Sequence, residues 1–286
     1  MTRPVFLRPV EIISSNKDFT LEEDGGGAVA KALTTGTYGS ILTVLDEFED
    51  LLQSGGVEAD FVVSLTSDLY VSIALQDGNG GGEVFDLVWT DTDLRDMLGF
   101  TGDLTFTGAQ THTATMTPSH LWFPTYERAN QSFFALEQNK IIKGINAASG
   151  QYCGYGTGTD RRRMQFEFEY EPAANVSDQY GTTQLVIDRN YDTFVYQARA
   201  ASMSSSTNTS SRGCYVYPDY TDADVTDDMS TNEGIQYGLS SSPDTHTWCH
   251  FDTTSPKVPS SALPSTMMHF NLSFSLITAT EPTWDV

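Results

Sequence analysis

An amphipathic helix predicted at Ser40–Gln53 constrains the first half of the chain more than any other feature. Its apolar residues recur at helical spacing, and acidic residues occupy the opposite face. Ser40 is a suitable N-cap, and Gly55 is a suitable stop. A single amphipathic helix must bury its apolar face, so neighbouring segments must supply a partner surface. The apolar positions are Ile41, Val44, Leu45, Phe48, Leu51 and Leu52.

The residues after this helix alternate between apolar and polar side chains, which is typical of half-buried strands. Phe61–Leu65 and Leu69–Leu75 form a predicted hairpin around a tight turn at Ser67–Asp68. Val84–Trp89 is a third predicted strand. We therefore expect the helix to lie across one three-stranded sheet, as a compact α+β layer.

A second, shorter helix is predicted at Asp91–Leu98. Asp91 is a suitable N-cap, Gly99 ends the helix, and Phe100 follows as a core residue. Thr111–Met116 is a predicted strand, and the apolar segment Leu121–Pro124 closes this part of the chain.

The second half is predicted to be richer in strands. Met164–Tyr170 alternates strictly and is the clearest strand in the sequence, and Thr182–Ile187 and His269–Ile277 are further strand candidates. Asn190–Ala201 has helical spacing. We predict a mainly β protein with a few helices (α+β). Residues 1–125 would form a helix-on-sheet domain, and residues 126–286 a β-sandwich-like domain.

The charge balance limits the partners of such a chain. Its 286 residues include 38 acidic and 15 basic residues, which gives a formal net charge of −23. A surface this negative repels nucleic acid and anionic membranes, so we expect neither as a partner. Three cysteines do not make a disulfide framework, and no apolar run resembles a signal peptide or a membrane span. These features favour a protein made in the cytoplasm.

Two charged clusters are candidate sites. The basic cluster contains Arg161, Arg162 and Arg163, and it is either a contact for an acidic neighbouring subunit or an ordinary solvated strand end. The acidic cluster lacks the EF-hand pattern, so a solvated loop is favoured over a calcium site. Its members are Asp219, Asp222, Asp224, Asp227 and Asp228.

Other motifs give weaker signals. On a helix, His246 and His250 would share a face and could hold zinc with Cys249. A fourth ligand is not evident, and the flanking residues favour a loop or a strand. The glycine-rich segments Gly25–Gly27 and Gly78–Gly82 lack the residues of phosphate-binding loops and are interpreted as turns. With no catalytic motif found, we predict neither an enzyme nor a resident cofactor.

Several segments resemble virion structural proteins. The order of Gly36–Tyr38, the amphipathic helix, the hairpin, Phe85–Trp89 and Leu98–Asp103 is similar to a helix-on-sheet virion module. The second half resembles distal-tail proteins of tailed phages in its alternating strand, its helix with Phe194 and Val195, its segment Tyr215–Asp219 and its closing strand Asn271–Ile277. This resemblance implies a subunit without catalytic residues, which assembles with other virion proteins.

The leading hypothesis is therefore a homo-oligomeric structural protein of a tailed virus, in the tail, baseplate or neck, assembled in the host cytoplasm. Its core or interface anchors would be Trp89, Phe100, Trp122 and Phe123. One alternative is a decoration or spike protein on the capsid. Another is a receptor- or glycan-binding module in which Trp248, Tyr215 and Tyr217 stack on sugars.

Overall fold

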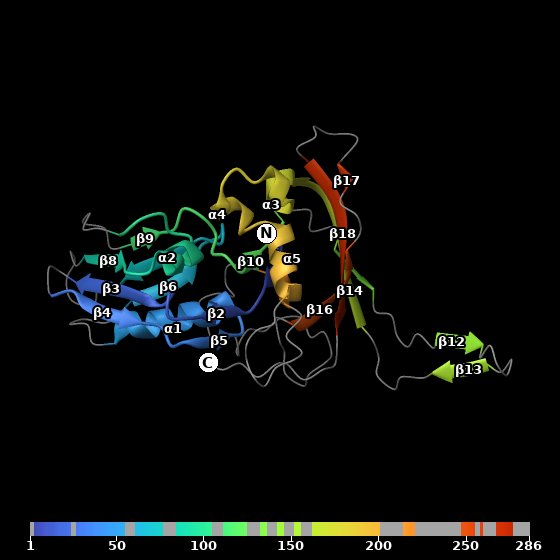
Figure 1. Cartoon of the computed structure of the whole chain (residues 1–286), viewed down its shortest axis with the longest axis horizontal. Coiled ribbons are helices and arrows are strands. Elements are labelled where there is room, and N and C mark those ends of the chain that lie inside the picture. Colours follow the sequence, from blue (N-terminus) through green and yellow to red (C-terminus); the bar gives the residue numbers. More distant parts are fainter. Residues whose placement is uncertain are drawn as a thin grey trace.

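The computed structural model describes most of the N-terminal half and separate helices and strands of the C-terminal half (Figure 1). The described residues are 3–23, 27–54, 61–76, 84–104, 111–124, 132–135, 142–145, 152–155, 162–200, 214–220, 247–254, 258–259 and 267–276.

The predicted hairpin is present as β6 (Phe61–Leu65) and β7 (Val71–Leu75), joined by a turn at residues 67–68. Its third strand is β9 (Thr111–Thr113), which pairs with β7. Alternate residues of β6 and β7 are buried, as their sequence pattern predicts.

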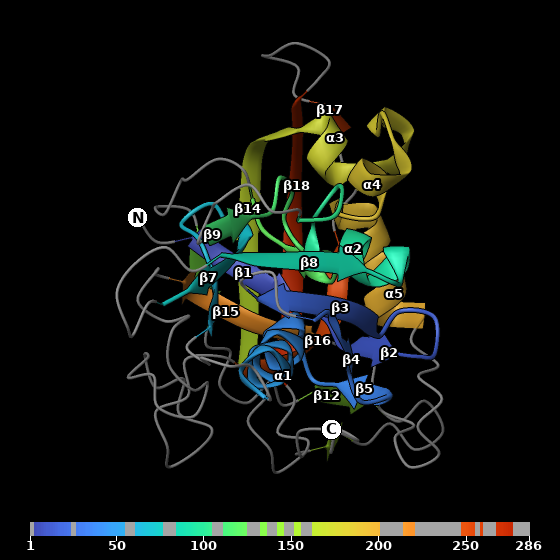
Figure 2. The same ribbon diagram turned by 90° about the vertical axis from the view of Figure 1, so that its left-hand side faces the viewer.

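A second small sheet contains β4 (Val29–Ala32), β3 (Asp18–Glu23) and β8 (Phe85–Trp89), in that order. Figure 2 shows β3 and β8 side by side. The expectation that β8 extends the hairpin is therefore wrong. β8 pairs with β3, which lies more than 60 residues earlier in the chain, because its buried residues face the same core as Phe19 and Leu21.

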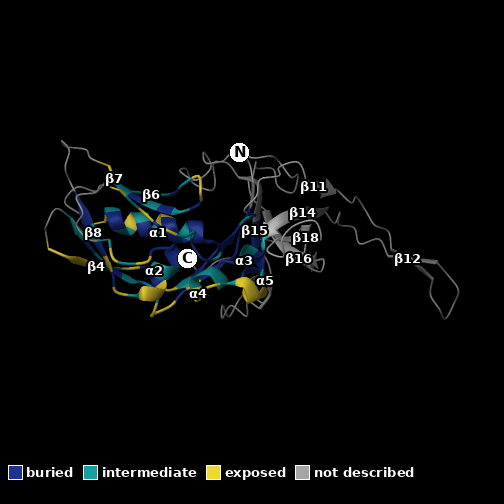
Figure 3. Cartoon of the chain, turned by 90° about the horizontal axis from the view of Figure 1, so that it is seen from above, coloured by how far each residue is buried: buried dark blue, intermediate teal, exposed yellow. Residues whose placement is uncertain are grey.

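Helix α1 (Ile41–Gln53) begins after Ser40, whose side chain accepts a hydrogen bond from the Leu42 amide as predicted for an N-cap. The helix contacts both small sheets, so the prediction of one helix across one sheet is wrong (Figure 3). Its Phe48 ring lies 4.7 Å from the Phe19 ring and 6.0 Å from the Trp89 ring, by ring centroids.

The same helix also covers the open edge of β6. The Glu49 carboxylate accepts a hydrogen bond from the Val63 amide at 2.6 Å, and the Gln53 side chain donates to the Phe61 carbonyl at 2.9 Å. An exposed strand edge would offer these backbone groups to other chains, so α1 closes this edge.

Helix α2 (Thr92–Leu98) ends at Gly99, whose φ of +88° is left-handed as a glycine C-cap requires. Asp91 precedes the helix, but its side chain makes no cap hydrogen bond. Its carboxylate instead accepts from the backbone amides of Lys17 and Asp18, and it thereby fixes the start of β3. Asp91 therefore occupies the predicted N-cap position, but its carboxylate binds the backbone of β3 and not the first turn of α2.

An antiparallel sheet of eight strands combines two N-terminal strands with six strands from the second half. Backbone hydrogen bonds between β1 and β15 therefore join residues on both sides of the predicted domain boundary. In order, the strands are β10 (Leu121–Trp122), β1 (Arg3–Leu7), β15 (Cys214–Tyr220), β16 (Thr247–Thr254), β18 (Met267–Leu276), β14 (Arg162–Pro172) and β11 (Ser132–Ala135), with β17 (Val258–Pro259) paired to β18.

Short helices follow β14: α3 (Ala173–Val176), a single 3-10 turn at Asp178–Tyr180, α4 (Gln184–Ile187) and α5 (Tyr191–Ala200). The strand predicted at Thr182–Ile187 is wrong. The Thr183 hydroxyl accepts a hydrogen bond from the Val186 amide and caps α4 at this point. The helix predicted at Asn190–Ala201 is confirmed.

Two further strand pairs complete the described structure. β2 (Val10–Ile12) pairs with β5 (Gly36–Tyr38), and β12 (Ile142–Ile145) pairs with β13 (Tyr152–Tyr155). The described chain is therefore a mixed α+β protein with several antiparallel sheets and a few helices. None of its described helices is long and apolar enough to cross a membrane.

Candidate functional site

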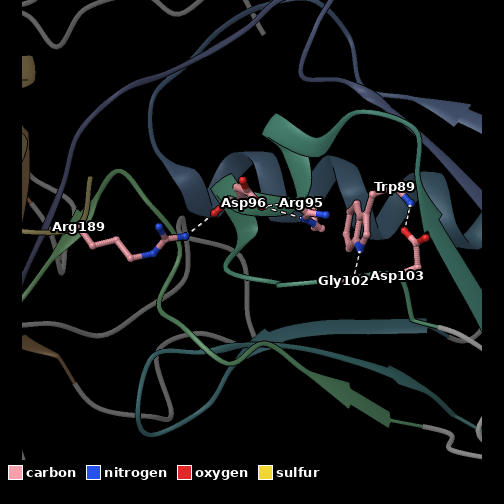
Figure 4. Close-up of polar contacts among 6 residues, drawn as sticks. All are labelled: Trp89, Arg95, Asp96, Gly102, Asp103 and Arg189. Carbon is pink, nitrogen blue, oxygen red and sulfur yellow. Dashed lines mark hydrogen bonds and ion pairs between the residues drawn. The ribbon is translucent and has the colours of Figure 1, made fainter. Parts of the chain in front are cut away.

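The predicted anchors Trp89 and Phe100 lie in the core of the N-terminal half. Their side chains are 5% and 3% exposed, and their ring centroids are 5.3 Å apart. The Trp89 indole donates to the Gly102 carbonyl, and the Trp89 amide donates to the Asp103 carboxylate (Figure 4). Of the two roles considered for these residues, the structure supports the role in the core.

Trp122 is also buried, and it connects the two halves of the chain. Its indole donates to the Asn175 carbonyl at 3.1 Å, and the Asn175 side chain donates back to the Phe123 carbonyl at 3.2 Å. Its ring contacts Phe6 on β1 and Tyr191 on α5. Trp122 therefore joins β1 and β10 to the helices after β14. Of the four predicted anchors, only Phe123 is half-buried rather than buried.

The two charged clusters lie largely outside the described residues. Arg161 is outside them, whereas Arg162 and Arg163 begin β14, opposite Leu276 and Ser275 of β18. Asp219 belongs to strand β15 rather than to a loop. Asp222, Asp224, Asp227 and Asp228 lie outside the described residues. The subunit-contact and calcium interpretations stay predictions.

Strand β16 contains Cys249 and His250, so the helical arrangement considered for zinc is wrong for these residues; His246 lies outside the described part. Among the described residues, no three His, Cys, Asp or Glu side chains gather as a metal site. Tyr215, a candidate for sugar stacking, is 2% exposed and therefore unavailable for a sugar. Tyr217 and Trp248 lie on strands β15 and β16.

A buried basic cluster, defined here as the buried Arg8 and Arg189 together with the half-buried His120, is the feature that the sequence analysis missed. Arg189 is 9% exposed, and its guanidinium donates to the carbonyl oxygens of Thr117, Asp96 and Leu185. Figure 4 shows this side chain extending towards Asp96 at α2. One arginine thereby joins the helices of the second half to two segments of the first half.

Arg8 and His120 form the other part of the cluster. The Arg8 amide donates to the His120 carbonyl at 3.0 Å. The His120 ring nitrogen Nδ1 lies 2.8 Å from the Ser119 hydroxyl, and the Ser119 amide donates to the Met97 carbonyl. His120 has a φ of +71°, and residues 119–120 form a turn that leads into β10.

The electrostatics of the cluster follow from burial. Burial lowers the pKa of Arg8 to about 9, and the negative charge of Asp188 opposes that change, so Arg8 stays charged at neutral pH. Burial also lowers the pKa of Arg189, against the charges of Asp188 and Asp96. The pKa of His120 lies well below its ordinary value because of burial, and because Arg8 and Arg189 repel an imidazolium.

This geometry does not fit nucleophilic catalysis. Ser119 and His120 are neighbours in sequence, and Ser119 is only 8% exposed. A general base must accept a proton, whereas two arginines disfavour the protonated form of His120. The arrangement instead offers fixed positive charge, which suits the binding of negative groups.

Comparison with protein-family models, curated proteins and solved structures found no match to this chain.

Proposed function

We propose that this chain is a structural subunit of a tailed virus, assembled in the host cytoplasm through contacts with its own copies and with other virion proteins. The sequence resemblance to distal-tail proteins supports a place in the tail, baseplate or neck. We interpret residues 126–286 as a β-sandwich-like assembly domain, in which β14, β16 and β18 would belong to one sheet that also includes β1 and β10.

The hairpin of β12 and β13 carries this proposal. Its strands pair with each other from Ile142↔Tyr155 to Ile145↔Tyr152, and they belong to a sheet of two strands. Figure 1 shows the hairpin at one end of the molecule, apart from every other labelled element. Among the described elements, it therefore has no second layer against which to pack.

An isolated two-stranded hairpin is at best marginally stable in water, because it has no second layer on which to bury apolar residues. Both of its outer edges offer backbone N–H and C=O groups for pairing. A neighbouring subunit supplies the missing layer, either by packing on the hairpin or by adding strands to its edges. We therefore assign the hairpin to contacts between subunits.

The strong negative charge sets a condition on this assembly. Copies that each carry a formal charge of −23 repel one another, and 0.1 M salt screens the repulsion between charges more than about 10 Å apart. Association should therefore strengthen between low and moderate salt.

The test replaces residues 141–156 with a short Gly-Ser linker and compares the sedimentation of this variant with that of the parent. The parent should sediment as an oligomer at moderate salt, and the variant should sediment as a smaller species. Far-UV circular dichroism and the urea midpoint should change little, since the hairpin lies outside the described core.

Tyr196→Ser is the matched control, because Tyr196 is 72% exposed on α5 and far from the hairpin in sequence. It should leave the oligomer intact. A hairpin variant of unchanged size, or equal dissociation by Tyr196→Ser, would remove the hairpin from its assigned role.

A further inference from the structure

Arg8 is a buried charge that feels the charge of Asp188 but makes no close ion pair with it among the described residues. The residue is 7% exposed, and its Nε atom has no hydrogen-bond acceptor. Among the described residues its guanidinium makes neither a hydrogen bond nor an ion pair. Burying an unpaired charge is costly, and native proteins ordinarily pair such groups.

The neighbouring acidic groups are already engaged. Asp188 is the carboxylate that acts on Arg8, and its Oδ1 accepts from the Gln184 side chain at 2.7 Å. Asp96 is paired with Arg95 at 2.7 Å. Arg189 differs from Arg8, because its donors are directed at three carbonyl oxygens. The cluster therefore holds two arginines near one loosely associated carboxylate, while His120 is neutral.

The exposure of the terminal nitrogen atoms of Arg8 decides whether an external group can bind to its guanidinium. Buried atoms without a hydrogen bond include Nε but not Nη1 or Nη2. Because those terminal atoms make no described hydrogen bond either, they must retain contact with solvent. A group arriving from outside can reach them, although most of the side chain is enclosed.

We propose that the guanidinium of Arg8 binds a small oxyanion, a carboxylate or phosphate group, that reaches it from outside the described part of the chain. A guanidinium presents paired N–H groups that match the two oxygens of either anion. The nearby charge of Arg189 adds to the attraction.

This anion has two sources with the same chemistry. One is a free ion such as inorganic phosphate. The other is an Asp or Glu side chain of a second copy, in a chain with 38 acidic residues. The second source rests on the proposed self-assembly, whereas the first is independent of it.

The test uses the full chain and inorganic phosphate, with chloride at matched ionic strength as the reference. Thermal unfolding and titration calorimetry measure phosphate binding, and sedimentation measures self-association. Arg8→Gln removes the charge. Arg95→Gln is the matched control, because Arg95 is partly exposed and already paired with Asp96.

If the anion is free, phosphate should stabilise the parent and Arg95→Gln, and Arg8→Gln should bind phosphate at least about tenfold more weakly. If the anion is a side chain of a second copy, Arg8→Gln should weaken self-association by at least about tenfold, while Arg95→Gln should not.

Equal phosphate binding together with equal self-association in the parent and Arg8→Gln would overturn the proposal. So would a parent that neither binds phosphate nor associates in a way that depends on Arg8. If Arg8→Gln does not fold, Arg8→Lys replaces it: lysine keeps the charge without the paired donors and should also bind more weakly. Undiminished binding or association in Arg8→Lys would equally overturn the proposal.

The hairpin replacement separates this inference from the proposed function. Loss of the oligomer in the hairpin variant with retained phosphate binding would leave the Arg8 site standing. If the hairpin variant binds phosphate and keeps the size of the parent oligomer, that result contradicts the assembly role of the hairpin but not the Arg8 site.

Discussion

Replacing Arg189 by methionine would remove the buried guanidinium that joins the two halves of the chain. Methionine fills a similar length but offers no donor to the carbonyl oxygens of Thr117, Asp96 and Leu185. In the variant the Asp96 carbonyl still accepts a hydrogen bond from the Gly99 amide, so this carbonyl loses only one of its two donors. The variant should therefore be destabilised mainly through the other two carbonyls.

The magnitude follows from those two groups. A buried acceptor left without a donor costs about 1–3 kcal/mol. The loss is partly offset because methionine carries no charge that must be buried. We expect the free energy of unfolding to fall by about 2 kcal/mol relative to the parent.

Urea unfolding followed by tryptophan fluorescence measures this change, and hydrogen exchange over residues 173–200 locates it. Exchange should accelerate there first, because Arg189 anchors these helices to the segment around Thr117. Arg95→Gln, which breaks a partly exposed ion pair, should cost less than about 1 kcal/mol. An Arg189→Met loss no larger than that of Arg95→Gln, or unchanged exchange, would refute the assigned role.

Three further substitutions test other parts of the account. Phe48→Ala should lower the free energy of unfolding by about 3–5 kcal/mol in urea titrations, since Phe48 is fully buried between two sheets; a loss below about 1 kcal/mol would contradict that packing. Gly99→Ala should cost at least about 2 kcal/mol by the same measurement, because a Cβ there would lie 2.1 Å from the Met116 carbonyl oxygen at a left-handed φ; a neutral effect would show that the turn relaxes. The lowered pKa of His120 means that the unfolded chain binds a proton that the folded chain rejects as pH falls below about 6.5. Stability should therefore fall by up to about 1.4 kcal/mol per pH unit from this residue, and His120→Asn should flatten the dependence of the urea midpoint on pH between 7 and 5.5; equal slopes in both proteins would contradict the prediction.

The sequence predicts those helices and strands whose structure depends on residues close to one another in the chain. The helical spacing of α1, its Ser40 cap and the alternation of β6 and β7 depend on neighbouring residues, and the structure confirms them. The left-handed Gly99 at the end of α2 belongs to the same class. In each case the signal and its structural consequence lie within one short segment.

Partners that are distant in sequence were not predicted. The sequence places β8 beside the nearest hairpin, whereas β8 pairs with β3. Alternation identifies a strand but not its neighbour in the sheet. Thr182–Ile187 favours a strand by composition, because it contains the β-branched residues Thr182, Thr183, Val186 and Ile187. The Thr183 side chain nevertheless caps a helix, α4, at this point.

The buried basic cluster was missed for a related reason. Arg8 follows Val5, Phe6 and Leu7 and precedes Pro9 and Val10. A single arginine within such an apolar run indicates a buried charge. It belongs to no motif and barely changes the composition. Its relation to Arg189, 181 positions later, arises only when β1, the turn at His120 and the helices after β14 pack together.

The mass of the parent protein in solution tests the central claim most directly. Sedimentation equilibrium at moderate salt and over a range of concentrations should give a whole-number multiple of the subunit mass. Purified protein should also be incorporated into virus particles assembled without their own copy. A strict monomer at every concentration that also fails to join particles would contradict the proposed role as an assembling virion subunit.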